Sequence, residues 1–326
     1  MPRLRRLSIR GRALAAIPLL IVTGCSAPAP PEASTASTAS AVALYTLAES
    51  NRGTPQDIRH GKPVDIGWHA ASGTFLVATY NDGTIYRGRL ADPDVPVYMT
   101  GTLGQTVAGI AVAGDLLYAA GSISGQIRVY DLATKAQVGR FETGSGGEVL
   151  DLAVTGSGDV WVTDGTRPVL WHLTAQQVAD GSGTPTALPL TPEVAFTPGP
   201  HNLSGIVAVS DRRLVVVHEG DGALYRIDLD PQAPRGRTIT RIEGATVRQG
   251  EGMALDGHRL VVADFHGLSI VDLTDDAGRA TAVTPVRDPA FNRVFSVARV
   301  ADRYVAVNSS TGDGQPYVLV SVPAAG

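Results

Sequence analysis

The chain has a single cysteine, Cys25, among 326 residues, so no disulfide can form within it. Aromatic residues make up only 6% of the sequence, and the formal net charge is −4, with a sequence pI of about 6.0. Without a basic surface the chain lacks the electrostatic footprint of a nucleic-acid-binding protein, so no nucleic-acid partner is expected. The catalytic and nucleotide motifs CxxC, GxSxG, HExxH and the P-loop are also absent.

The N-terminus has the features of an export signal. Residues 1–12 contain arginines and no acidic residue, and residues 13–23 form an apolar run that is too short to span a bilayer. The run closes with Val-Thr-Gly before Cys25, which resembles the bacterial lipobox. We therefore expect residues 1–24 to be a lipoprotein signal peptide and Cys25 to be lipidated. The alternatives are an ordinary signal peptide with an incidental cysteine, and, through Arg5-Arg6, twin-arginine rather than Sec export.

The segment after the cysteine has no large apolar side chain and cannot contribute to a core. Residues 26–40 read SAPAPPEASTASTAS, which is typical of a flexible spacer. We therefore expect residues 25–40 to be the lipidated cysteine and its spacer. The predicted location is the cell membrane, with the folded part attached through the lipid and facing the extracytoplasmic side.

Helical periodicity is nearly absent from the rest of the chain, whereas short runs of Val, Ile, Leu and Tyr recur between glycines and aspartates. Each copy of this pattern predicts a strand, a tight turn, a second strand, a loop and a third strand, with a fourth strand in the more variable stretch that follows. Four-stranded units of this kind stack around an axis, so the sequence predicts an all-β protein, a six-bladed β-propeller over residues 41–326. A solenoid is the alternative, but its strands would not form antiparallel hairpins at this spacing. The six copies begin at Val64, Ala108, Leu150, Ser204, Glu251 and Phe295.

The sixth copy leaves no residues for its own outer strand, because it ends close to the C-terminus. Residues 41–47, AVALYTL, precede the first copy and have strand character. We expect this N-terminal strand to complete the last blade, which would close the ring and remove a free sheet edge.

Four stretches of the repeats have a distinctive pattern: residues 63–90, VLDLAVTGSGDVWVTDGTRPVLWHL from Val149, LSGIVAVSDRRLVVVHEGDGALYRIDL from Leu203 and GEGMALDGHRLVVADF from Gly250. They resemble the SMP-30/gluconolactonase-like six-bladed propellers, and in particular an exported bacterial branch of that family. The resemblance covers roughly residues 60–322. It implies a lactonase or esterase that uses a calcium or zinc ion on the propeller axis, held by Glu, Asn and Asp at the starts of the inner strands.

The residues at these positions differ from the family's ligands. Val64, Leu150 and Ser204 stand where the resemblance implies metal or substrate contacts, and only Glu251 keeps a charged ligand type. A hard divalent cation needs about six oxygen ligands. The sequence therefore gives no certain cofactor, and a divalent cation depends on Glu251 alone. A shift of one residue in the alignment would instead place Asp65 and Asp151 on the axis.

The loops between second and third strands offer further candidates, because they open on the same face as the inner-strand starts. The candidate catalytic set is Glu251 with Ser204 and Asp264, and a histidine with a carboxylate is the usual pairing for zinc or for general-base work. Asp and Asn in such loops also stabilise turns without any further role. The additional ligand-binding candidates in these loops and in the link into the fourth repeat are His201, His218 and His266.

Apolar residues at the inner-strand starts, among them Val64, Leu150 and Phe295, have two interpretations. They fill the channel as a plug, or they line an apolar mouth that binds a small molecule. Three functions follow: a lactone or ester hydrolase with an altered site, a non-catalytic propeller that binds a small-molecule or protein ligand, and a metal-free enzyme with an apolar pocket. Nothing in the sequence indicates an oligomer, so a monomer is expected.

Overall fold

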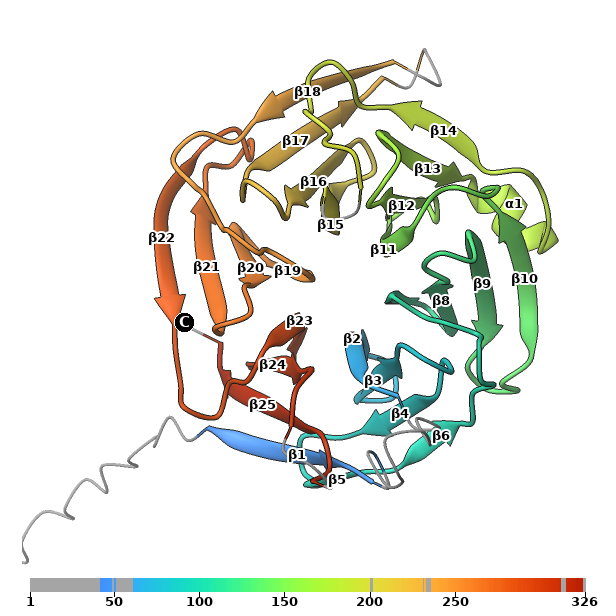
Figure 1. Ribbon diagram of the computed structural model, residues 1–326, viewed down its shortest axis with the longest axis vertical. Coiled ribbons are helices and arrows are strands. Elements are labelled where there is room, and N and C mark those ends of the chain that lie inside the picture. The colour runs from blue at the N-terminus through green and yellow to red at the C-terminus, as the bar shows by residue number, and fades with distance from the viewer. Residues whose placement is uncertain are drawn as a thin grey trace, which may run out of the picture. The chain divides into compact units, whose positions relative to one another are not determined.

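The computed structural model describes residues 42–48, 50, 61–199, 202–230, 232, 236–311 and 315–324. These residues form six β-sheets that are arranged as blades around a central axis (Figure 1). One short helix, α1 (Ala175–Asp180), is present in the same part of the chain. The predicted all-β, six-bladed propeller is therefore confirmed. The signal peptide, Cys25 and the spacer lie outside the described residues.

Each blade is built from consecutive antiparallel hairpins, with its first strand next to the axis. The first two blades contain β2 (Pro63–His69), β3 (Thr74–Thr79), β4 (Ile85–Gly88) and β6 (Val97–Met99), then β7 (Gly109–Ala113), β8 (Leu116–Ala120), β9 (Gln126–Asp131) and β10 (Gln137–Glu142). The next two contain β11 (Val149–Val154), β12 (Val160–Asp164), β13 (Val169–Leu173) and β14 (Thr186–Pro189), then β15 (Leu203–Ser210), β16 (Arg213–His218), β17 (Leu224–Leu229) and β18 (Arg237–Arg241). The last two contain β19 (Met253–Asp256), β20 (Arg259–Ala263), β21 (Leu268–Leu273) and β22 (Ala280–Val286), then β23 (Val294–Val300), β24 (Arg303–Asn308), β25 (Val318–Pro323) and β1 (Ala43–Leu47).

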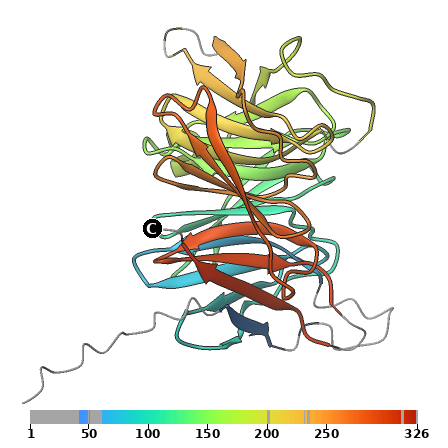
Figure 2. The ribbon, with the colours of Figure 1, turned by 90° about the vertical axis from the view of Figure 1, so that its left-hand side faces the viewer.

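The second strand of a blade is covered on both faces by the neighbouring blades. All six residues of β3 are buried, whereas most of the outer strand β22 is exposed. This difference explains why the second strands are continuous apolar runs and the outer strands are mixed. Figure 2 shows the ring from the side, with successive strands of a sheet twisted relative to one another.

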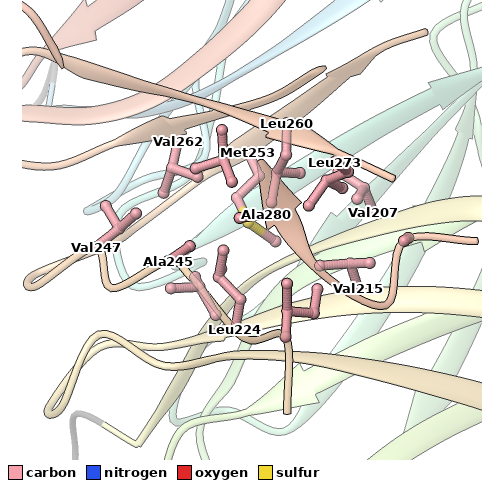
Figure 3. Packing of buried hydrophobic residues seen from close by; sticks show 14 residues of the cluster. Val207, Val215, Leu224, Ala245, Val247, Met253, Leu260, Val262, Leu273 and Ala280 are labelled. Atoms are coloured by element: carbon pink, nitrogen blue, oxygen red, sulfur yellow. The ribbon is translucent and has the colours of Figure 1, made fainter. Parts of the chain in front are cut away.

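The core is divided among the six contacts between adjacent blades, each of which holds one cluster of buried apolar side chains. Figure 3 shows the cluster between the fourth and fifth blades, where Val215 and Leu224 from one sheet face Met253 and Leu260 from the other. Because a blade buries its faces only against its neighbours, the repeats stabilise one another around the ring.

The N-terminal strand β1 lies at the outer edge of the sixth blade. It pairs antiparallel with β25, so that Ala43 faces Ser321 and Thr46 faces Val318. On its other side it pairs parallel with the short strand β5 (Asp94–Val95), which precedes the outer strand of the first blade. The two ends of the folded region are thereby joined in one sheet.

None of the helices in the described part of the chain is long and apolar enough to span a bilayer.

Candidate functional site

The starts of the six inner strands surround one cavity of about 320 Å³ on the axis. All six residues that begin the repeats line it, so the apolar members do not fill the channel. Five carboxylates and no basic side chain contribute to the same wall. The lining consists of Val64, Asp65, Tyr80, Ala108, Glu148, Leu150, Asp151, Ser204, Glu219, Glu251, Gly252, Phe295 and Ser296.

Irregular backbone at the strand starts directs these residues toward the axis. The pairing register of the inner strands shifts beside Val64, between Val149 and Leu152, and between Leu203 and Ile206. Such bulges let two successive residues face the same side of a sheet. They explain why Val64 and Asp65, like Leu150 and Asp151, both reach the cavity, so that either register of the sequence alignment identifies lining residues.

Asp65 connects three blades. Its Oδ1 accepts hydrogen bonds from the backbone N–H of Ile66, at 2.8 Å, and from the hydroxyl of Ser296, while its Oδ2 accepts from the backbone N–H of Ile110. Burial raises the pKa of Asp65 to about 6, although these hydrogen bonds act to lower it.

Asp151 has the same arrangement in the third blade. Its Oδ1 accepts from the N–H of Leu152 at 2.7 Å and its Oδ2 from the N–H of Ile206, in the fourth blade, at 3.0 Å. Burial raises the pKa of Asp151 well above its usual range, and the charges of Asp65 and Glu251 raise it further. These two aspartates thus use their oxygens to hold inner strands together, because a buried N–H left without an acceptor is costly.

Glu251 begins the fifth repeat and is one of the carboxylates that line the cavity. Its Oε2 accepts a hydrogen bond from the Ser204 hydroxyl at 2.5 Å. Burial raises the pKa of Glu251 to about 8, the neighbouring charge of Glu219 adds to the increase, and Ser204 opposes it. At neutral pH this carboxyl group is therefore mostly protonated and can donate a hydrogen bond as well as accept one.

Two cations lie beside the mouth without being part of its wall. The Lys62 ammonium lies 4.7 Å from the centre of the Phe295 ring, which also stacks on Phe265 with ring centres 5.2 Å apart. The Arg293 guanidinium lies over both rings, 5.2 Å from Phe265 and 5.6 Å from Phe295. Burial and the nearby Arg293 lower the pKa of Lys62, whereas Glu251 raises it. The aromatic faces at this point are thus occupied by the protein's own cations.

The structure does not bring the remaining predicted residues into this cavity. Asp264 is buried, where it accepts hydrogen bonds from Ser269 and, at 2.8 Å, from Arg287. His218 is buried with its Nδ1 3.0 Å from Asp221, and His266 is exposed. Asp264 and Asp221 thus make contacts with neighbouring residues of the fold, which agrees with the interpretation that polar residues of these loops stabilise turns. His201 lies outside the described residues.

The donor set on the axis does not fit a divalent cation. Among the described residues no group of three or more His, Cys, Asp or Glu side chains is placed to hold a metal ion. The charges of Asp65 and Glu251 act on Asp151, but the oxygens of the two aspartates face backbone N–H groups. A tight calcium or zinc site needs several ionised ligands that converge on one point. The ion implied by the family resemblance therefore has no set of ligands here.

Sequence reasoning missed two polar residues of the cavity wall, Glu148 and Ser296. Glu148 comes from the link before β11, two residues ahead of the predicted strand start, and accepts a hydrogen bond from Ser122 at 3.3 Å. Ser296 follows the last predicted strand start and reaches Asp65. Including the residues on both sides of each strand start would have found both.

No protein-family model and no curated protein matches this sequence. Solved structures with a similar fold include a Bacteroides thetaiotaomicron structural-genomics protein of unknown function, with a TM-score of 0.62 and 14% identity over 86% of this chain and 76% of that chain. A second is U3-55K, with a TM-score of 0.60 and 11% identity over 87% of this chain and 99% of that one. At these identities the likeness concerns the fold alone.

Proposed function

We propose that this chain is a propeller of the cell envelope that binds a small organic molecule in its axial cavity, without a metal ion. The observation that carries the proposal is the hydrogen-bonded pair of Glu251 and Ser204, 2.5 Å apart, in a cavity of about 320 Å³ whose other walls include Val64, Leu150 and Phe295. A concave site with apolar walls and a few polar groups is the usual form of a small-molecule site.

The charge of the wall limits the ligand. Five acidic side chains and no basic one line the cavity, so its wall offers no positive charge to an anion, even with Glu251 protonated. A neutral molecule with a hydroxyl or carbonyl group can exchange hydrogen bonds with Glu251. An amine can pair with the negative charge of Glu219, which also lines the cavity. We infer that the ligand is neutral or cationic and that its apolar part contacts Val64 and Leu150.

Calorimetric titration tests the metal-free character of this binding. Calcium or zinc at millimolar concentration is expected to give no heat of binding, and chelator is expected to leave the melting temperature unchanged. Thermal-shift screening with lactones, sugars and amines is then expected to find stabilising ligands among the neutral and cationic members. At a concentration one hundred times Kd such a ligand stabilises by about 2.7 kcal/mol. Tight binding of either metal, or stabilisation by anions alone, would contradict the proposal.

A second function, hydrolysis of a lactone or ester without a metal, is favoured by the raised pKa of Glu251. A carboxyl group with a pKa of about 8 is suited to general acid–base work, and the nearby Glu219 raises that pKa through its negative charge. In this case the protonated Glu251 would give its proton to the leaving oxygen while a carboxylate accepts a proton from the attacking water. The resemblance to gluconolactonase-like propellers supports it. Turnover of the lactone panel that persists in chelator and is lost in Glu251→Gln would distinguish this function from binding alone.

The proposed location depends on lipid at Cys25, for which the lipobox-like sequence is the support. Cys25→Ser is expected to abolish labelling of the protein by radioactive palmitate in a bacterial host and to shift it out of the membrane fraction. The lipid would be attached through a thioether bond to the cysteine sulfur, and serine has no sulfur with which to form that bond. Ser26→Ala is the matched control and is expected to leave labelling unchanged. An ordinary signal peptide would instead give the same soluble product from both variants.

A further inference from the structure

A second cavity, of about 390 Å³, lies between the first and second blades. It lies beside His69, the last residue of β2, whereas Val64 near the start of that strand lines the axial cavity. Five residues of extended strand separate the two by about 17 Å. The two cavities are thus separate sites at opposite ends of the inner strands.

The chemistry of this cavity differs from that of the axial one, because two cations lie in its wall over a single aromatic ring. The Arg87 guanidinium lies 3.8 Å and the Lys135 ammonium 4.3 Å from the centre of the Tyr98 ring. Tyr98 is fixed by its own hydrogen bonds: its hydroxyl donates to the carbonyl of Leu132, and its carbonyl accepts from Lys135 Nζ at 2.8 Å. The stacked cations are therefore held in place by contacts from both blades.

Arg87 has no acceptor for its guanidinium among the described residues. Its nearby neighbour Arg89, by contrast, donates to the carbonyl of Ser72 at 2.7 Å. A guanidinium stacked on a ring keeps its N–H groups in the ring-parallel plane, where they can bind two oxygens of one anion. Lys135 uses one of its three hydrogens on Tyr98 and has two left.

A polar wall completes the cavity. Ser72 Oγ lies 2.7 Å from His69 Nδ1 and 2.6 Å from Thr74 Oγ1. His69 Nε2 is buried and lies 3.3 Å from an oxygen of Asp115, without the alignment of a hydrogen bond. Asp115 is the one carboxylate of the lining and is 79% exposed, so it only partly offsets the two cations.

We propose that this cavity is a binding site for a small oxyanion, a phosphate or carboxylate group. Arg87 binds two of its oxygens, Lys135 supplies the second positive charge, and the hydroxyl groups of Ser72 and Thr74 lie within the same cavity. The site would act independently of the axial cavity, for which we propose a neutral or cationic ligand.

Isothermal titration of the full chain with inorganic phosphate and with citrate, at low ionic strength, tests the site. Arg87→Gln is expected to weaken binding at least tenfold, because it removes the charge and the paired donors together. Arg140→Gln is the matched control, since Arg140 is exposed on the second blade and pairs with Glu142 at 2.9 Å, outside the cavity. Equal affinities of the two variants, or no binding of either anion by the unaltered protein, would overturn the proposal.

A second arm identifies the source of the anion and guards against misfolding. Phosphatidylglycerol vesicles are expected to leave the affinity for phosphate unchanged if the ligand is a free anion, and to compete with it if the cavity takes a lipid headgroup. Tyr98→Leu removes the ring that orders both cations and is expected to weaken binding in parallel with Arg87→Gln. If Tyr98→Leu does not fold, the comparison of Arg87→Gln with Arg140→Gln alone decides the outcome.

Discussion

Replacing Glu251 with glutamine is expected to raise the stability of the protein at pH 8 and to flatten its dependence on pH. Burial and the charge of Glu219 raise the pKa of Glu251 from 4.5 to about 8, so the folded state binds a proton that the unfolded chain releases. A carboxyl group of this kind contributes stability below pH 4.5 and loses it as the pH rises through 8. Glutamine resembles the protonated acid and keeps the interaction with Ser204.

The expected difference between the two proteins at pH 8 is on the order of 2 kcal/mol, or about 5 °C in melting temperature, since one pKa unit is worth 1.36 kcal/mol and the side chain retains some exposure. Melting curves at intervals from pH 4 to 9 measure it. The unaltered protein should melt at a lower temperature with each step above pH 5, and Asp65, whose pKa is raised to about 6, should contribute in the same direction.

Glu243→Gln is the control, because it makes the same chemical change at an exposed position in the link between the fourth and fifth blades. It should reproduce the pH dependence of the unaltered protein. If Glu251→Gln also reproduces it, Glu251 is ionised in the folded state, and the proposed role of its proton in ligand binding is removed as well.

Gly205→Ala is expected to destabilise the fold by about 3 kcal/mol, the upper end of the usual cost of overpacking. A Cβ at this position would overlap the carbonyl oxygen of Glu251 in the next blade and would lie 3.0 Å from Met253. Backbone atoms cannot move aside as a side chain can, so the fourth and fifth inner strands would have to separate. Urea denaturation followed by circular dichroism measures the loss.

The same substitution should also disturb the site, because it moves the backbone that positions Glu251 beside Ser204. Binding of any ligand found for the axial cavity is therefore expected to weaken together with stability. Gly257→Asn provides the control: this turn glycine has φ +60° and open space around it, and asparagine tolerates that conformation. A cost for Gly205→Ala no larger than that of the control would contradict the close approach of the Glu251 carbonyl to Gly205.

The repeats predicted the fold because each blade has to bury two faces against its neighbours. Every repeat therefore contains apolar strands that indicate this burial. The six residues chosen as strand starts all line the axial cavity, from Val64 to Phe295. The roles of individual side chains were harder to predict from the sequence. Asp65 and Asp151 are of a residue type that often binds metal ions, but their oxygens accept hydrogen bonds from backbone N–H groups of adjacent blades. These contacts join residues far apart in the sequence, so no local sequence pattern predicts them.

The second cavity was not predicted, for a related reason. Arg87 and Tyr98 belong to the outer half of the first blade, and Lys135 to a turn of the second blade. Only the packing of one blade on the next brings them together. His218 and His266 illustrate the opposite case: the loop that carries His218 also supplies Glu219 to the axial cavity, but neither histidine lines it.

The pairing of β1 with β25 also sets the order in which the molecule can be completed. Ala43 is among the first residues of the folded region to be synthesised, and its partner Ser321 is among the last. Closing so long a loop is slow compared with forming a hairpin. Individual blades can form while the chain is still emerging, but the ring stays open until its final strand is released. A chain interrupted before β25 would therefore present an unpaired sheet edge, which makes truncated copies ready substrates for aggregation or proteolysis.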